Sequence, residues 1–258
     1  MKGASAWLTS LPLEDENFVL NKREFFDAVA MRYRWELKRL PINCACNRPF
    51  NADHAMQCQL GGFIIRRHNR IRDLFAKILD EVADEVRIEP PLQPVTGETL
   101  SEGTLLDDEA HPDIAARGFW QKYEMAFFDI RVFNPFAKSH MNRTLKAVFR
   151  SNESGKKTDY NDRVIKIEHG SFTPVVMSSF GGFGKESSQF LSKLVEKVAE
   201  KRGIEKSEVA NYIRTKVSYE LIRSQVACIR GSRSLWKKPL INTGDIELVN
   251  SSTNITEN

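Results

Sequence analysis

The sequence predicts an α/β protein with a mixed β-sheet flanked by helices and a small metal-binding segment near its N-terminus. Long segments whose apolar residues recur every three to four positions predict the helices, and short apolar runs between them predict the strands. Three cysteines and one histidine within fifteen residues predict the metal-binding segment. A chain of 258 residues has room for one medium domain and one small one.

The composition is that of a globular protein, with 41% hydrophobic and 28% charged residues. The formal net charge of +4 is compatible with a nucleic-acid partner but does not identify one. No apolar run reaches the roughly 20 residues of a membrane helix, and acidic residues come too early for a signal peptide. We therefore expect an intracellular protein that does not bind a membrane.

The first predicted helix begins after Asn21, whose side chain can accept from the first turn while the Glu24 carboxylate returns to the cap backbone. Pro41 is expected to end it, because proline lacks the N–H that a helix interior needs. An apolar stripe recurs between them at helical spacing, formed by Phe25, Val29, Tyr33 and Leu37.

A second helix is predicted over 64–85, where apolar residues keep the helical period and charged residues crowd the opposite face. Val86 then opens a short strand, which the two following prolines stop. The polar and acidic stretch over 93–110 is expected to be a loop.

Two strands are predicted next, over 112–117 and 123–134. The second is apolar and aromatic, with one acid, Asp129, in its middle. A basic linker that contains some helix is expected over 137–162.

Two further strands are predicted near 163–168 and 172–180. Glycines after the second of them turn the chain into helices over about 185–201 and 207–229. This order of helices and strands predicts an α/β architecture with a mixed sheet.

We divide the chain into four segments. The first, 1–42, carries the N-terminal amphipathic helix, and the second, 43–62, is the metal-binding segment. Residues 63–236 form the main α/β domain with its C-terminal helices. The last segment, 237–258, lacks periodicity and is expected to be a disordered tail.

The metal-binding segment reads Cys44-x-Cys46-x7-His54-x3-Cys58. Three thiolates and one imidazole are the ligands of a closed tetrahedral zinc site, which predicts a structural Zn²⁺ knuckle. The alternative is that the cysteines are small buried hydrophobes and His54 a core histidine. Cys228 lies far from the cluster on an apolar helical face and is expected in the core.

Two acids fall on the predicted strands, Asp113 at the start of one and Asp129 inside the next. If these strands pair, the two carboxylates can share one divalent cation, and such sites cut phosphodiesters. Alternatively, Asp129 lies on a solvent-exposed face beside Arg131 or Lys122, and Asp113 caps a turn. A third ligand is expected from the 64–85 helix, or from Glu168.

Several motifs follow the cysteine cluster in one order: Arg67-His68-Asn69, Glu89-Pro90, Pro112-Asp113, Asp129 and Lys156-x3-Tyr160. This order resembles the C-terminal region of site-specific non-LTR retrotransposons, which carries a CCHC knuckle followed by a restriction-like endonuclease. The resemblance implies a PD-(D/E)XK fold that nicks DNA.

The resemblance also implies roles for single residues. Asp113 and Asp129 become the ligands of Mg²⁺ or Mn²⁺, and Lys156 and Tyr160 belong to a KxxxY element. Arg131 stands where a lysine completes the D-x-K pattern, so the role of that lysine falls to Lys156 or Lys157. The residues expected to contact DNA are Arg67, His68, Asn69 and Lys157.

The expected function is therefore that of a divalent-metal-dependent DNA endonuclease derived from a retroelement. The alternatives are an inactive nucleic-acid-binding module and a structural relic. The expected partner is DNA, with RNA as the alternative. No Tyr-x-Asp-Asp reverse-transcriptase motif occurs in the chain, so that polymerase is expected to act from elsewhere. The resemblance implies a nuclear location.

Overall fold

The computed structural model describes residues 4–10, 18–107 and 110–233. The tail expected over 237–258 lies outside these residues. No helix in the described part of the chain combines the length and the apolar character of a membrane span.

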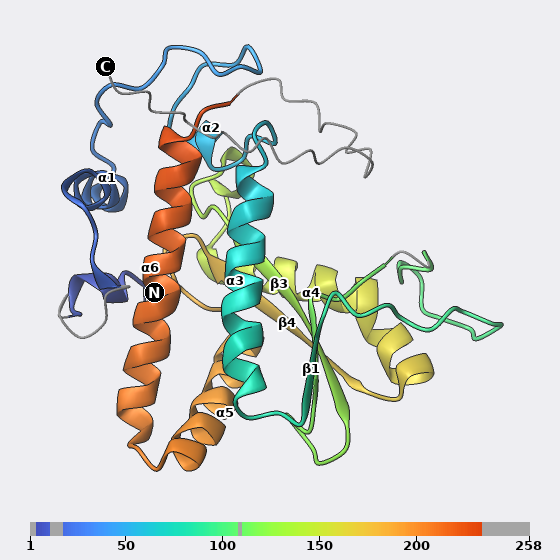
Figure 1. The fold of residues 1–258 in the computed structure, drawn as a ribbon. Helices are drawn as coiled ribbons and strands as arrows, with labels where there is room; N and C mark the ends of the chain where they lie inside the picture. The colour runs from blue at the N-terminus through green and yellow to red at the C-terminus, as the bar shows by residue number, and fades with distance from the viewer. Residues whose placement is uncertain (1–3, 11–17, 108–109, 234–258) are drawn as a thin grey trace, which may run out of the picture.

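A four-stranded mixed sheet forms the centre of the molecule (Figure 1). Its order is β1 (Glu85–Ile88), β2 (Ile114–Arg117), β3 (Met125–Phe133) and β4 (Ser171–Ser178). The pairs β1–β2 and β2–β3 are antiparallel, and the pair β3–β4 is parallel. The predicted mixed α/β architecture is therefore confirmed.

Four long helices flank the sheet: α3 (Phe63–Asp80), α4 (Leu145–Arg163), α5 (Lys185–Arg202) and α6 (Lys206–Arg230). Helix α4 connects β3 to β4, because parallel neighbours cannot be joined by a tight turn. The predictions for α3, α5 and α6 hold to within a few residues at each end. Between β1 and β2, the described residues contain neither helix nor strand, as predicted for that loop.

Alternation along β3 sends its side chains to two separate layers. Phe128 and Ile130 join the main core under α3, α5 and α6. Phe127 and Phe133 point to the other face, where they pack against residues of α4. Asp129 has the same parity as Phe127 and Phe133, so it lies on the α4 side of the sheet.

The first helix, α1 (Lys22–Tyr33), begins with the predicted capping box but ends earlier than predicted. Arg34 adopts the left-handed conformation, with φ of 59°, and stops the helix well before Pro41. The predicted apolar stripe was only partly right: Phe25 and Tyr33 are 52% and 56% exposed, whereas neighbours such as Met31 are buried. The face toward the protein carries small side chains, such as Ala30, and a buried acid.

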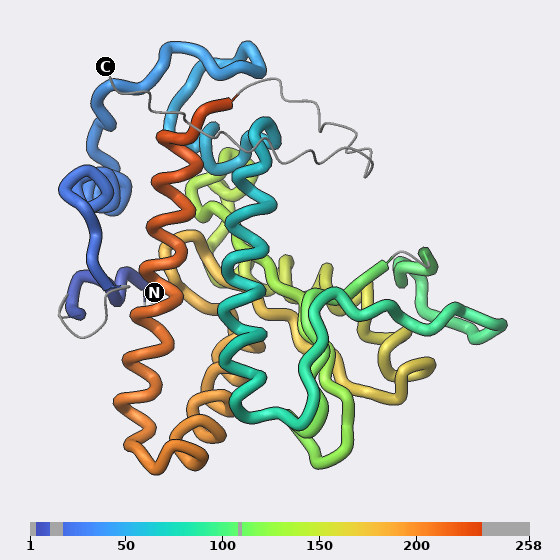
Figure 2. The backbone as a smooth tube through the Cα atoms, viewed as in Figure 1, coloured from blue at the N-terminus to red at the C-terminus, as the bar shows by residue number. Residues whose placement is uncertain are grey.

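That buried acid is Asp27, which is fully enclosed. Both of its oxygens accept from the guanidinium of Arg230 on α6, at 2.6 and 2.7 Å. Figure 2 shows the N-terminal segment in blue running beside the red end of the last helix. This ion pair acts together with apolar contacts between α1 and α6, since Ala28 packs with Tyr219 and Met31 packs with Cys228.

The strand predicted over 163–168 was also wrong. Val164–Glu168 continues α4 as a π-helical turn. Val164 and Ile167 are buried while Ile165 is 52% exposed. In VIKIE the apolar residues alternate as in a strand, yet burial of residues three apart requires a helix.

Candidate functional site

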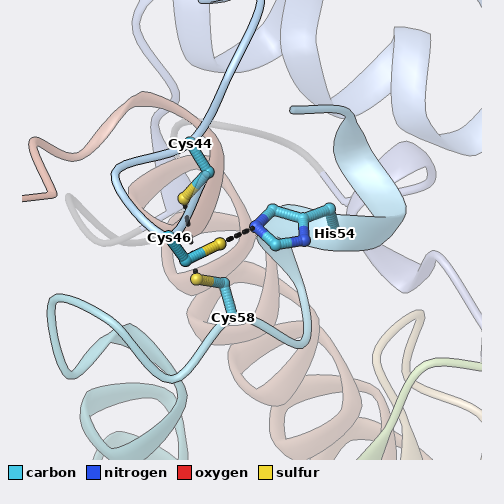
Figure 3. Close-up of side chains that lie close together, drawn as sticks. All are labelled: Cys44, Cys46, His54 and Cys58. Carbon is cyan, nitrogen blue, oxygen red and sulfur yellow. Dashed lines mark hydrogen bonds between the residues drawn. The ribbon is translucent and has the colours of Figure 1, made fainter. Parts of the chain in front are cut away.

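The cysteine and histidine side chains of the N-terminal segment converge on one point (Figure 3). Cys44 and Cys46 lie in a tight turn, in which Cys44 N donates to the Arg48 carbonyl at 2.8 Å. His54 lies in the short helix α2 (Ala52–Ala55), and Cys58 follows it. Asn51 caps that helix by accepting from His54 N at 2.8 Å.

The distances fit a tetrahedral zinc site. The four ligand atoms lie within 4.8 Å of one another. Cys44 Sγ and Cys58 Sγ are 3.7 Å apart, and Cys46 Sγ lies 3.3 Å from His54 Nε2. A tetrahedron with Zn–S bonds of about 2.3 Å requires S···S edges of about 3.8 Å. A disulfide requires about 2.05 Å instead, so the cluster has the spacing of ligands around one ion and can bind zinc.

The electrostatics of His54 also suit a metal ligand. Partial burial lowers the pKa of its imidazole, and the charges of Arg233 and Arg48 add to this effect. A lower pKa keeps the ring neutral at physiological pH, which is the form that donates a lone pair to a metal.

The knuckle, meaning residues 43–62, is fixed to the end of α6. Met56 and Phe63 pack with Cys228 and Ile229 in one apolar cluster. The predicted core position of Cys228 is confirmed, since it is fully buried. Burial raises the pKa of its thiol, as expected for a packing residue rather than a reactive one.

The two acids predicted to share a cation lie side by side. Ile114 pairs with Phe128 in the β2–β3 ladder, and one step further along the same register brings Asp113 opposite Asp129. Asp113 Oδ2 accepts from the backbone N–H of Ile130 at 2.5 Å. Both acids are buried, with 7% and 4% of their surfaces exposed. The alternative that Asp129 occupies a solvent-exposed face is therefore wrong.

Helix α4 brings a cation to this pair. Lys156 Nζ lies 3.0 Å from Asp129 Oδ2 and 3.2 Å from Asp129 Oδ1. Tyr160 lies one turn further along the helix, with its ring centroid 5.6 Å from the Lys156 ammonium. Its hydroxyl donates to the His111 carbonyl at 3.3 Å. The predicted Lys-x3-Tyr spacing therefore places both side chains on the helix face that covers Asp129.

Helix α3 contributes one more group. His68 Nε2 lies 2.7 Å from Asp113 Oδ1, and about a third of the imidazole is exposed. The 64–85 helix was expected to supply a third group to the site, and His68 is the residue that reaches it. We therefore define the carboxylate site as Asp113, Asp129, Lys156, Tyr160 and His68.

Burial and repulsion shape the protonation of the carboxylate site. Burial raises the pKa of Asp129 to about 6, the neighbouring charge of Asp113 adds to the rise, and Lys156 opposes it. The pKa of Tyr160 is also raised, mainly by burial and then by Asp129 and Asp113. Burial of one carboxylate next to another therefore favours the protonated form of Asp129.

Other predicted residues lie elsewhere. Arg67 is only 4% exposed and points to the carbonyl of Met56, which leaves little of its guanidinium to reach a phosphate. Lys157 Nζ forms an ion pair with Glu186 at 3.0 Å. Arg131 is exposed on β3, and Asn69 is half-buried on α3.

Glu168 is not part of the carboxylate site. Its Oε1 accepts from the backbone N–H of Gln93 at 2.6 Å, so its carboxylate fixes the loop after β1.

Besides Asp27, a second buried acid, Glu153, was not predicted from the sequence. Glu153 on α4 is 8% exposed, and burial raises its pKa. Its Oε1 accepts from the backbone N–H of Glu186 at 3.0 Å, in the first turn of α5. A Cβ at Gly184 would lie 2.1 Å from that oxygen, so the glycine makes room for it. Nothing in the sequence separates this acid from the solvated charges of an ordinary helix.

Comparison with known proteins adds no relative: no family model matches the chain, and a search of curated proteins finds no significant match. The function has to be argued from the knuckle and the carboxylate site themselves.

Proposed function

We propose that the chain is a divalent-metal-dependent DNA endonuclease with a PD-(D/E)XK fold. The observation that carries this proposal is the pair of buried carboxylates, Asp113 and Asp129, on adjacent antiparallel strands with the Lys156 ammonium 3.0 Å from one of them. The position of the acids also supports the proposal. The resemblance implies metal-binding acids in a mixed α/β core, and β2 and β3, which carry them, are the two central strands of this sheet.

The donor set suits Mg²⁺ or Mn²⁺. Carboxylate oxygens are the hard ligands that these ions prefer, and Asp113 and Asp129 present theirs from adjacent strands of one sheet. Asp129 Oδ2 is enclosed by protein and receives no well-directed hydrogen bond, although the Lys156 ammonium lies near it. Asp113 and Asp129 would hold the cation, whose positive charge would offset the repulsion between the two carboxylates.

When bound, the divalent ion acts as a Lewis acid on the phosphodiester and makes a coordinated water a better nucleophile. The chain's own residues orient and shield this chemistry. Lys156, about a quarter exposed at its side chain, is placed to donate to a water or a phosphate oxygen beside Asp129. His68 holds Asp113 in position through its 2.7 Å contact.

Lys156 takes the part of the lysine that the D-x-K pattern places two residues after the second acid. That position holds Arg131, which is exposed on β3. The ammonium is instead supplied from α4, across the face of the sheet. Tyr160 packs beside it and keeps bulk water from the buried side of Asp129. On the same resemblance, we propose a retroelement origin, a nuclear location and a reverse transcriptase supplied elsewhere.

The test is the nicking of supercoiled plasmid with Mg²⁺ or Mn²⁺, and with Ca²⁺ as the unreactive control. We expect open circles with the first two ions and none with Asp113→Asn. Asp162→Asn is the matched control, because Asp162 is a surface acid of α4 that pairs with Lys166 at 3.0 Å. Binding of plasmid without nicking under every metal condition contradicts the enzyme and leaves a nucleic-acid-binding module.

Lys156→Ala is expected to slow nicking by roughly a hundredfold, the usual cost of removing one donor that stabilises charge in a transition state. Lys157→Ala is the matched control, because Lys157 is the adjacent residue and is paired with Glu186 away from the acids. Its nicking rate is expected to stay within about twofold of the wild type, since it touches no reacting group. Single-turnover rates at saturating Mg²⁺ separate the two variants, and equal losses contradict the role of Lys156.

A further inference from the structure

Two large aromatic side chains lie in solvent at the end of α1. Tyr33 and Trp35 are 56% and 59% exposed. Their rings stack on each other, with 5.4 Å between centroids and 25° between planes. We call this pair the aromatic platform. Adjacent exposed aromatic side chains are common at binding surfaces. A protein without a partner is more stable when such large apolar rings are buried away from water.

The backbone holds the platform in place. Arg34, which lies between Tyr33 and Trp35 in the sequence, has the left-handed conformation and reverses the chain. Trp35 N then donates to the Ala30 carbonyl at 2.8 Å. The Arg34 guanidinium then forms two bonds to the Asp53 carboxylate, at 3.0 and 3.2 Å. Because the turn is tied to the knuckle, the rings are preorganised and lose little entropy when a ligand binds.

The surroundings of the platform are basic. Residues 32–39 read RYRWELKR, with Glu36 as the sole acid. Arg32, Lys38 and Arg39 are exposed, whereas Arg34 is neutralised by Asp53. The Arg32 guanidinium lies 5.8 Å from the centre of the Tyr33 ring. Positive charge therefore surrounds the exposed rings.

Trp35 lines a groove of about 740 Å³. Asn134 and Phe136, from the loop after β3, line it too, and no residue of the carboxylate site does. Phe136 is 43% exposed and has the Arg34 guanidinium 4.6 Å from its ring centre. A third exposed aromatic ring, that of Phe136, therefore lines the same groove as Trp35.

We propose that the aromatic platform, with Arg32, Lys38 and Arg39, binds single-stranded nucleic acid. Unpaired bases stack on exposed aromatic rings, and nearby cations contact the phosphates that follow. A duplex fits less well, because its base faces are already stacked on one another. This surface is separate from the carboxylate site, so the inference does not depend on the proposed nuclease.

The experiment is a fluorescence-polarisation titration with labelled 20-nucleotide single strands of DNA and of RNA, beside a blunt DNA duplex. Divalent metal and chelator are both left out, so that nothing is cut and the knuckle stays loaded. The variants are Tyr33→Ala/Trp35→Ala and, as the matched control, Tyr123→Ala. Tyr123 is 72% exposed and has Lys122 5.0 Å from its ring, but it lies in the β2–β3 turn.

We expect the platform variant to bind single strands roughly ten- to a hundredfold more weakly, because bases can no longer stack on the two rings. Tyr123→Ala is expected to bind like the wild type. Arg32→Gln/Lys38→Gln should reduce the salt dependence of binding, because fewer counterions are released. Zinc content and thermal midpoint confirm that each variant is folded, and the DNA and RNA arms show which strand is preferred.

Preference for the duplex, equal losses in the platform and control variants, or no binding by the wild type each overturn the inference. Repeating the titration with Asp129→Asn distinguishes a failure of this inference from a failure of the proposed nuclease function. That variant should bind single strands normally while failing to nick, and the platform variant should retain Mg²⁺ binding at the carboxylate site.

Discussion

Asp129→Asn is expected to abolish nicking and also to stabilise the Mg²⁺-free protein at neutral pH. Loss of a carboxylate ligand removes the divalent ion and with it several kcal/mol of transition-state stabilisation, which corresponds to a rate loss of about a thousandfold or more. The gain in stability follows from the burial of the same carboxylate, only 4% exposed and next to Asp113.

The raised pKa of Asp129 also determines how the stability of the protein changes with pH. Asp129 titrates near 6 in the folded chain against 3.8 in the reference state. The folded state therefore holds this proton more tightly, and the resulting stability is present at acid pH and lost as pH rises through about 6. The cost at pH 8 is about 3 kcal/mol, at 1.36 kcal/mol for each pKa unit.

Denaturant unfolding at pH 5 and pH 8 without Mg²⁺ measures this effect. The stability difference between Asp129→Asn and the wild type should grow toward pH 8. Asp162→Asn is the control, and its effect on stability should have the opposite sign. Hydrogen bonds from Lys166 and Ser101 lower the pKa of Asp162, so its ionised form stabilises the folded state. A variant less stable than the wild type at pH 8 would show that the Lys156 contact outweighs the burial of the charge.

Cys58→Ser is expected to reduce bound zinc from one ion per chain to none and to unfold the knuckle. Structural zinc supplies much of the folding free energy of such small segments, on the order of 10 kcal/mol in isolated knuckle-sized peptides. In this protein Cys228 and Ile229 of α6 also pack against Met56 of the knuckle. We therefore expect loss of order over the knuckle rather than of the sheet.

Cys228→Ser is the matched control. Cys228 is also a buried cysteine in contact with the knuckle, but it lies outside the ligand cluster. It should retain one zinc ion and lose only about 1–2 kcal/mol from burying a hydroxyl. Metal analysis and limited proteolysis of the two variants, each compared with chelator-treated wild type, give the result. Full zinc content in Cys58→Ser contradicts the proposed ligand set.

Local patterns in the sequence were enough to predict the knuckle and most of the sheet. The cysteine and histidine spacing is set by one tight turn and one helical turn, so four ligands within fifteen residues converge without help from the rest of the chain. The apolar run around Asp129 similarly predicts a strand, whatever lies on either face.

Long-range packing decided what the sequence could not show. Lys156 meets Asp129 because α4 crosses the sheet between two parallel strands, and no local spacing encodes that crossing. Arg67, predicted to contact DNA, is covered by the knuckle, which lies before it in the chain. The buried face of α1 could not be predicted in full, because it includes an acid, Asp27. The partner of that acid, Arg230, lies 203 residues away in the sequence.

The position of α6 has a consequence for biosynthesis. This last helix contributes Ile213 and Val217 to the main core, Tyr219 to the cluster beneath α1, and Cys228 to the cluster beneath the knuckle. The segments that precede α3 therefore cannot bury all of their apolar groups until α6 has been synthesised. Contacts of such long sequence separation form slowly and leave incomplete chains prone to aggregation, so chaperones should bind those segments during translation.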